Sequence, residues 1–148
     1  MSKFVIFLQQ PFKTKVLLLK ILFLLPATQL CVTILPLNKL ITIFRLKQST
    51  QKPQGIFDPT EREYIALIYW AVSSIQRNVP FMHRAQCLAQ ALTARYFLRK
   101  KHLPCTLLIG ANIKNKGQLE AHAWLTHGNS TLNFGSNNEI FTELTRFY

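Results

Sequence analysis

Two stretches decide the fold: residues 86–92, QCLAQAL, and residues 120–135, EAHAWLTHGNSTLNFG. The first places Leu88 and Leu92 four positions apart among small residues, a spacing that is typical of one face of a helix. The second alternates small or apolar residues with polar ones and then reaches Gly-Asn at 128–129, a strong signal for a tight hairpin turn. A helix followed by antiparallel strands predicts an α+β fold.

Further out from these stretches, the helix is expected to cover residues 85–101, and three strands follow it. The apolar run CTLLIG at 105–110 is typical of a short strand, and QLEAHAWLT at 118–126 alternates as a half-buried strand does. Residues 130–134 are expected to form the returning strand of the hairpin. His122 stands in the middle of the second strand between two alanines, which leave room beside its ring.

Upstream, residues 58–77 begin with Asp-Pro-Thr-Glu. An aspartate cap, a proline in the first turn and a glutamate three positions after the cap together predict a helix start. Residues 48–57, QSTQKPQGIF, are the expected linker. This linker divides the chain into a basic, apolar helical arm over residues 1–50 and a domain over residues 58–148.

The arm is rich in Leu and Ile, but a membrane span needs about 20 continuous apolar residues. Lys20, Pro26 and Pro36 interrupt the apolar run, so we expect one or two short helices, either buried against the domain or lying at an interface. Basic flanks suit a membrane surface or a partner protein. A true span is the remaining alternative, and no secretory signal with a clean cleavage site opens the chain.

The net charge is +12, with 18 Lys and Arg against 6 Asp and Glu, and residues 1–57 contain no acidic residue. Such a balance indicates either a solvated basic surface or a negatively charged partner, which would be an anionic membrane, an acidic peptide or a nucleic acid. Aromatic residues are not interleaved with the basic ones, which argues against nucleic acid. Peripheral membrane contact through residues 1–57 is the functional alternative that we keep.

Three cysteines, Cys31, Cys87 and Cys105, do not make a disulfide framework, and a reducing cytoplasm fits such a set. Cys105 lies in an apolar strand and is expected to be a core residue. His83 and Cys87 are four positions apart, but no second pair of ligands and no C-x-x-C motif accompanies them. We therefore expect no metal site.

Cys87 and His122 are the candidate catalytic pair. Cys87 falls in the first turn of its helix, where unpaired amide hydrogens and the helix dipole favour a thiolate. A strand laid across the start of that helix would bring the ring of His122 to the sulfur as a general base. A third group should hold the imidazole through its other nitrogen. Asn133 on the returning strand is the first candidate, and Asn137 and Asn138 are alternatives.

The same residues also have a plainer interpretation. A single cysteine is usually a small buried apolar residue, and a single histidine in a strand usually packs against its neighbours. We expect His127 to be a turn residue. Trp124 is expected to pack in the core, although its place two positions after His122 also suits a platform for substrate.

Three marks within residues 65–140 give the chain a resemblance to a known family. They are the Cys-Leu-x-x-Ala-Leu helix at 87–92, Leu-x-Ile-Gly at 107–110 and Ala-His-Ala-Trp at 121–124. In this order and at these distances they resemble the transglutaminase-like cysteine protease of lasso-peptide biosynthesis, the B protein that removes the leader peptide. The basic, Leu-rich arm also resembles the arm of the stand-alone form of that protein.

The resemblance implies a papain-like core with a Cys–His–Asp type of triad, in which Cys87 matches the nucleophile and His122 the base. The third position departs from the family pattern, because Asn133 is found where an aspartate is usual. The resemblance also implies a cytoplasmic peptidase with three partners. These are a precursor peptide, a separate protein that recognises the leader, and a lasso cyclase that resembles asparagine synthetase.

Cleavage in some members of that family depends on ATP, but this chain contains no G-x-x-x-x-G-K-[ST] phosphate loop, so no cofactor is evident. The alternative function belongs to a different class. A non-catalytic scaffold of the same fold would bind a peptide or a partner enzyme, in contact with a membrane or not, and would leave the thiol unused.

Overall fold

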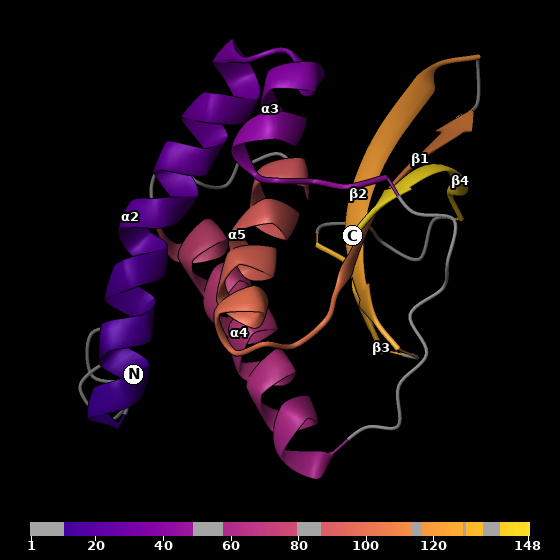
Figure 1. The fold of residues 1–148 in the computed structure, drawn as a ribbon. Helices are drawn as coiled ribbons and strands as arrows, with labels where there is room; N and C mark the ends of the chain where they lie inside the picture. Colours follow the sequence, from indigo (N-terminus) through magenta and orange to yellow (C-terminus); the bar gives the residue numbers. More distant parts are fainter. Residues whose placement is uncertain (1–10, 49–57, 80–86, 114–116, 129, 135–139) are drawn as a thin grey trace.

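The computed structural model describes residues 11–48, 58–79, 87–113, 117–128, 130–134 and 140–148. Within these residues helices precede strands along the chain, and the predicted α+β class is confirmed. Figure 1 shows the helices gathered on one side of the sheet. The helices are α2 (Phe12–Ile34), α3 (Leu37–Ile43), α4 (Pro59–Asn78) and α5 (Cys87–Lys100), and the strands are β1 (Thr106–Ile113), β2 (Leu119–His127), β3 (Ser130–Leu132) and β4 (Thr142–Phe147).

The sheet has the strand order β3-β2-β1-β4, and each neighbouring pair of strands is antiparallel. β1 and β2 pair along their whole length, from Ile113 opposite Leu119 to Thr106 opposite Thr126. Within the described residues, β3 pairs with β2 only from Leu125 to His127. The edge of β2 that precedes Leu125 is therefore available to another part of the fold, and α5 begins there.

α4 begins as the sequence predicted. The side chain of Asp58 accepts a hydrogen bond from the amide of Thr60 at 3.2 Å, and Pro59 occupies the first turn. The cap satisfies one of the amides that a helix start leaves unpaired. The helix ends at Asn78, after which Val79 is extended.

α5 is the central helix of the fold, and it packs against β1 and β2 as well as against α2 and α4. Ala89, Ala91 and Ala94 are fully buried, and their small side chains let the neighbouring elements approach closely. The helix ends where His102 adopts a left-handed conformation with φ 58°. The amides of His102 and Leu103 then bond back to the carbonyls of Arg99 and Leu98, which closes the last turn.

α2 differs from our expectation of short helices. It runs for 23 residues straight through Pro26, and only the second helix of the arm, α3, is short, with 7 residues. A proline inside a helix costs about 3 kcal/mol. Each fully buried Leu or Ile contributes about 1.5–3 kcal/mol, and Leu18, Ile21 and Leu25 are buried on this helix. Their packing against α4 and α5 outweighs the proline and keeps the helix continuous.

By length and composition α2 is also long and apolar enough to cross a membrane, with a mean hydropathy of 2.0 over a window of which 22% is buried. Such a helix is compatible with a membrane anchor and with a core helix. Its outer side presents large apolar side chains to solvent, which we call the outer face of α2. The outer face consists of Phe12, Leu19, Phe23, Leu30 and Ile34.

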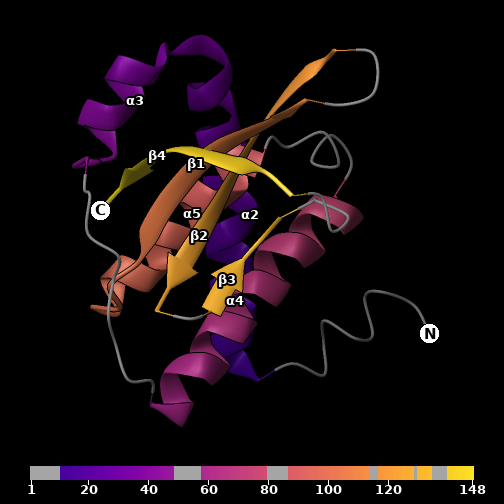
Figure 2. The ribbon, with the colours of Figure 1, turned by 90° about the vertical axis from the view of Figure 1, so that its right-hand side faces the viewer.

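The end of the arm pairs with the last strand of the sheet. The amide of Lys47 donates to the carbonyl of Tyr148 at 3.0 Å, and the amide of Tyr148 donates to the carbonyl of Lys47 at 2.7 Å. Gln48 forms an isolated β-bridge with Phe147. Both views show the segment after α3 beside the C-terminal end of the chain (Figures 1 and 2). Apart from Gln48, the expected linker lies outside the described residues.

Candidate active site

Cys87 is the first residue of α5, and its side chain meets β2 at the edge that lies before the described pairing with β3. The backbone amide of Ala123 donates a hydrogen bond to the sulfur of Cys87 at 3.3 Å. This contact forms because β3 reaches back along β2 only to Leu125, so that the amide of Ala123 faces the start of α5. The helix N-terminus and a strand amide thus converge on one sulfur atom, and both favour negative charge there.

His122 precedes Ala123 on β2, and its ring lies between two partners. Its Nε2 hydrogen-bonds to the side-chain oxygen Oδ1 of Asn133. A carbonyl oxygen only accepts, so Nε2 carries the proton in this pair. The ring also hydrogen-bonds to the side chain of Cys87, and Nδ1 is the nitrogen that remains for this contact. The tautomer set by Asn133 is therefore the one in which Nδ1 accepts the thiol proton.

The three residues predicted from sequence thus lie in one chain of contacts, Cys87 to His122 to Asn133. We expected Asn133 to lie within the returning strand. Instead, β3 ends at Leu132, and Asn133 follows it. The other residues considered near the site, His83, Asn137 and Asn138, lie outside the described residues.

The surroundings of the sulfur change its acidity. Burial raises the pKa of Cys87. The hydrogen bond with His122, the backbone amides of Ala123 and Leu88 and the positive charge of His122 outweigh burial, so that the pKa lies below its ordinary value of 9.0. The contact with Cys87 raises the pKa of His122 above 6.5, and burial opposes this while Asn133 supports it. Both shifts favour a thiolate–imidazolium pair.

Two aromatic rings contact the imidazole. The ring of Phe141 stacks on His122 with centroids 4.7 Å apart, and that of Trp124 lies at 5.9 Å with an interplanar angle of 16°. Trp124 follows from the period of the strand, because residues two apart on β2 share a face. Phe141, which precedes β4, is a site residue that the sequence analysis missed, and a single phenylalanine in a polar segment gives no signal that could have found it.

Gly110 makes room for this cluster. It pairs with His122 across the β1–β2 ladder. A Cβ atom at Gly110 would stand 2.7 Å from the ring of Trp124 and 2.6 Å from the carbonyl oxygen of Thr142. The glycine therefore lets the indole cross β1 and lets β4 approach, at a point where the β1–β4 register shifts.

Tyr69 of α4 supports the segment that carries Asn133. Its hydroxyl donates a hydrogen bond to the backbone carbonyl of Asn133 at 3.1 Å. Its ring stacks on Phe134, with centroids 5.1 Å apart. Tyr69 was also missed from sequence, because its partner lies 64 positions away.

The two remaining candidates, Cys105 and His127, are both buried away from Cys87. Cys105 is buried, as predicted, and burial raises its pKa to about 11, so it remains a thiol at neutral pH. The prediction that His127 is a turn residue was wrong. His127 ends β2 with only 5% exposure, its Nδ1 bonds to the carbonyl of Pro104, and its Nε2 lies 3.5 Å from Glu61. Among the described residues, no three His, Cys, Asp or Glu side chains are grouped as metal ligands.

A cysteine at the start of a helix, with a histidine on an adjacent antiparallel strand, defines a class of cysteine-dependent acyl-transfer sites. The comparison with family models agrees. The model described as the transglutaminase-like superfamily matches residues 31–146, and the chain belongs to this superfamily. The observed helices and sheet are consistent with a transglutaminase-like core, and the superfamily generally includes cysteine peptidases and transferases. Comparison with curated proteins and with solved structures found no match.

Proposed function

We propose that this protein is a cysteine peptidase that removes the leader peptide from a ribosomally made lasso-peptide precursor. The observation that supports it most is the contact chain at the site. The sulfur of Cys87 accepts a hydrogen bond from the amide of Ala123 and contacts the ring of His122. Nε2 of that ring is hydrogen-bonded to Asn133. The narrower part of the proposal, the lasso-peptide leader as substrate, rests on the motif resemblance at residues 87–92, 107–110 and 121–124.

The reaction proceeds in two steps. The thiolate of Cys87 attacks the scissile carbonyl, the C–N bond breaks, and His122 gives its proton to the leaving amine, so that an acyl-enzyme carries the leader. Water, deprotonated by His122, then attacks the thioester and releases the leader as a carboxylic acid. The developing oxyanion would be stabilised by backbone amides at the start of α5. Water is the only co-reactant that this chemistry needs, and no cofactor enters it.

Asn133 keeps the imidazole in one orientation through both steps. An asparagine orients the ring as an aspartate does, but it adds no negative charge to stabilise the imidazolium. Acylation consequently relies more on the amides around the sulfur than it would with an aspartate at this position. We expect slower turnover than an aspartate would give, rather than an inactive enzyme.

The proposed partners follow from the same pathway. They are the precursor peptide, a separate protein that recognises the leader, and a cyclase that joins the freed amine of the core peptide to a side-chain carboxyl. We place the reaction in the cytoplasm, at the inner face of the membrane. The outer face of α2 supports this placement, because five exposed apolar side chains lie on a helix that also carries Lys13, Lys15 and Lys20 and no acidic residue.

The test is cleavage of a candidate precursor by the purified full chain together with its recognition partner, followed by mass spectrometry. Wild type should release the leader, and Cys87→Ala and His122→Ala should each lose at least about a hundredfold in rate. Cys31→Ala is the matched control, because this half-buried thiol of α2 is not part of the site. Cleavage by Cys87→Ala at the wild-type rate would disprove the mechanism. If the precursor binds and nothing is cut, the protein is the non-catalytic scaffold instead.

A further inference from the structure

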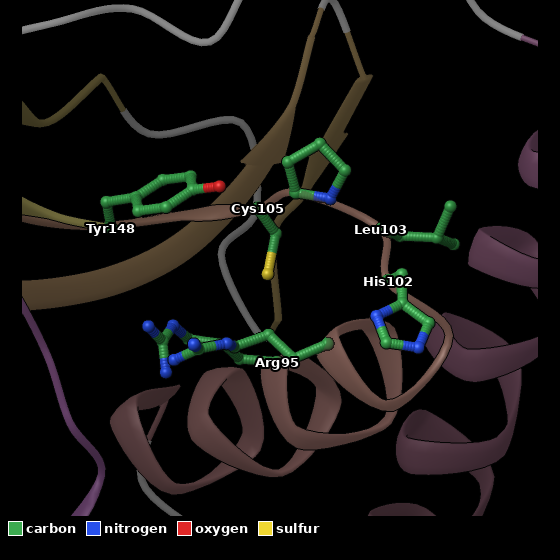
Figure 3. A pocket seen from close by; sticks show the side chains of 7 residues that line it. Arg95, His102, Leu103, Cys105 and Tyr148 are labelled. Atoms are coloured by element: carbon green, nitrogen blue, oxygen red, sulfur yellow. The ribbon is translucent and has the colours of Figure 1, made fainter.

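A polar cavity lies at the other end of α5 from Cys87. It has a volume of about 220 Å³ and is lined by Arg95, Arg99, His102, Cys105 and Tyr148, with Leu103 and Pro104 on its wall. We call it the Arg95 pocket. Figure 3 shows Arg95 and Cys105 facing each other across this space, with Tyr148 beside them. Arg95 lies two helical turns after Cys87, so the pocket is separate from the candidate active site.

Arg95 is a buried cation with unused donors. Its side chain is 3% exposed. Nη1 donates to the carbonyl of Phe44 at 3.1 Å, whereas Nε and Nη2 are buried and have no hydrogen-bond partner among the described residues. These two nitrogens share one edge of the guanidinium, the edge that grips two oxygens of a carboxylate or phosphate. A buried donor that is left unpaired costs free energy, and a buried unpaired charge costs more.

The described lining of the pocket supplies no acidic side chain to pair with Arg95. Cys105 is a neutral thiol at pH 7, because burial raises its pKa to about 11. Burial lowers the pKa of Arg95 and the nearby charge of Arg99 lowers it further, whereas Cys105 and Tyr148 oppose these effects without cancelling them.

The end of α5 does not oppose a negative ligand strongly. Carbonyls at a helix C-terminus repel anions, but the effect falls off within the last turn. The carbonyl of Arg99 already accepts the amide of His102, and that of Leu98 accepts the amide of Leu103. Tyr148 and His102 add polar side chains that can hydrogen-bond to oxygen atoms.

We propose that the Arg95 pocket binds an oxyanion group, a phosphate or a carboxylate, through Nε and Nη2 of Arg95 with support from Arg99. The bound anion neutralises the buried guanidinium and satisfies its two donors. The pocket is large enough for one such group and a few atoms attached to it. This inference does not depend on the proposed peptidase activity.

The first experiment measures thermal unfolding of the full chain in inorganic phosphate and in acetate, each against sodium chloride at equal ionic strength. Wild type should show a saturable rise in Tm with at least one of the two anions. A stronger response to phosphate would identify a phosphorylated ligand, and a stronger response to acetate would identify a carboxylate. If neither anion raises Tm above the chloride control, the proposal is wrong.

Variants decide whether Arg95 carries the effect. Arg95→Met keeps much of the side-chain volume without the charge, and it should abolish the anion-dependent rise. Arg77→Met is the matched control, because this exposed arginine of α4 lies away from the pocket and should leave the rise intact. An anion response that survives in Arg95→Met would overturn the assignment.

If Arg95→Met does not fold, Arg99→Met replaces it. Arg99 is exposed, so its removal should leave the fold intact. It should weaken phosphate binding, measured by calorimetry, by up to about fivefold. Unchanged affinity in Arg99→Met, together with unchanged affinity in an Arg95→Lys variant, would contradict the proposed ligands.

Discussion

Gly110 lies directly across the β1–β2 ladder from His122, and the missing side chain of this glycine is what admits the indole of Trp124 beside the imidazole. The position of the candidate base thus depends on a residue that has no functional group. A Cβ atom at Gly110 meets a backbone carbonyl on β4 as well as the indole, so rotation of one side chain does not relieve the clash.

We therefore expect Gly110→Ala to lower the free energy of unfolding by about 1–3 kcal/mol, the usual cost of overpacking. Urea denaturation followed by circular dichroism would measure the change. Ala121→Ser is the control, because Ala121 is an exposed residue of β2 and should tolerate the extra atom. Equal stability of Gly110→Ala and wild type would show that β4 moves away without cost.

The pH dependence of alkylation tests the acidity of the sulfur. Because the pKa of Cys87 lies below 9.0, its reaction with iodoacetamide should reach half its maximal rate below pH 9.0. In His122→Ala the hydrogen bond that lowers this pKa is gone while burial still raises it, so the midpoint should move upward. Peptide mapping by mass spectrometry separates Cys87 from Cys105, which should stay unmodified because its pKa is about 11. The same midpoint in wild type and His122→Ala would show that His122 does not lower the pKa of Cys87.

Asn133 is expected to affect turnover rather than binding. Asn133→Ala removes the acceptor of Nε2 and frees the ring, and a misplaced base costs about a hundredfold in kcat. KM should change little, because Asn133 holds the base and not the substrate. Asn133→Asp should turn over faster than wild type, since a carboxylate accepts the same proton and adds negative charge beside the imidazolium. Unchanged kcat in Asn133→Ala would mean that another group orients His122.

Tyr69 tests the support behind Asn133. Tyr69→Phe keeps the stacking on Phe134 but removes the hydroxyl that donates to the Asn133 carbonyl. This should lower the free energy of unfolding by about 0.5–1 kcal/mol. Tyr96→Phe on α5 is the control, because this ring is also partly exposed, at 48% against 39% for Tyr69. A larger loss of stability in Tyr96→Phe than in Tyr69→Phe would contradict a supporting role for the Tyr69 hydroxyl.

The outer face of α2 is tested by sedimentation of the full chain with vesicles that contain phosphatidylglycerol. Phe23→Gln combined with Leu30→Gln should weaken vesicle binding by about tenfold or more, because each apolar side chain that enters lipid contributes more than 1 kcal/mol. Leu144→Gln is the control, since it removes an equally exposed leucine, 67% exposed, from β4. Wild-type binding should fall in high salt. Equal binding of the double variant and the wild type would contradict membrane contact through this face.

The parts that sequence predicted are those whose signals are local. The cap of α4 at Asp58, the hairpin after His127 and the helix that Cys87 opens each follow from residues a few positions apart. The pairing of Cys87 with His122 was also within reach, because a reactive thiol needs a base and the alternation of β2 points His122 to one face. The catalytic roles of Cys87 and His122 stay a prediction until the variants are assayed.

The parts that sequence did not predict depend on contacts between distant segments. Pro26 interrupts a helix in isolation, but packing against α4 and α5 overrides it. His127 follows an alternating strand and precedes a glycine, so only the folded structure shows that Pro104 and Glu61 enclose its ring. Phe141 and Tyr69 reach the site from other parts of the chain, and no spacing in the sequence predicts their contacts there.

The pairing of Lys47 with Tyr148 has a consequence for the order of events during synthesis. The ribosome makes α2 and α3 before the sheet, and Gln48 meets Thr145 only after another 97 residues have been added. Loop closure over such a distance is slow compared with helix formation. The same delay applies to the thiol, because Ala123 and His122 emerge after Cys87, and Phe141 later still. A nascent chain thus lacks the contacts from His122 and Ala123 that lower the pKa of Cys87, and the sulfur gains them only when β2 packs against the start of α5.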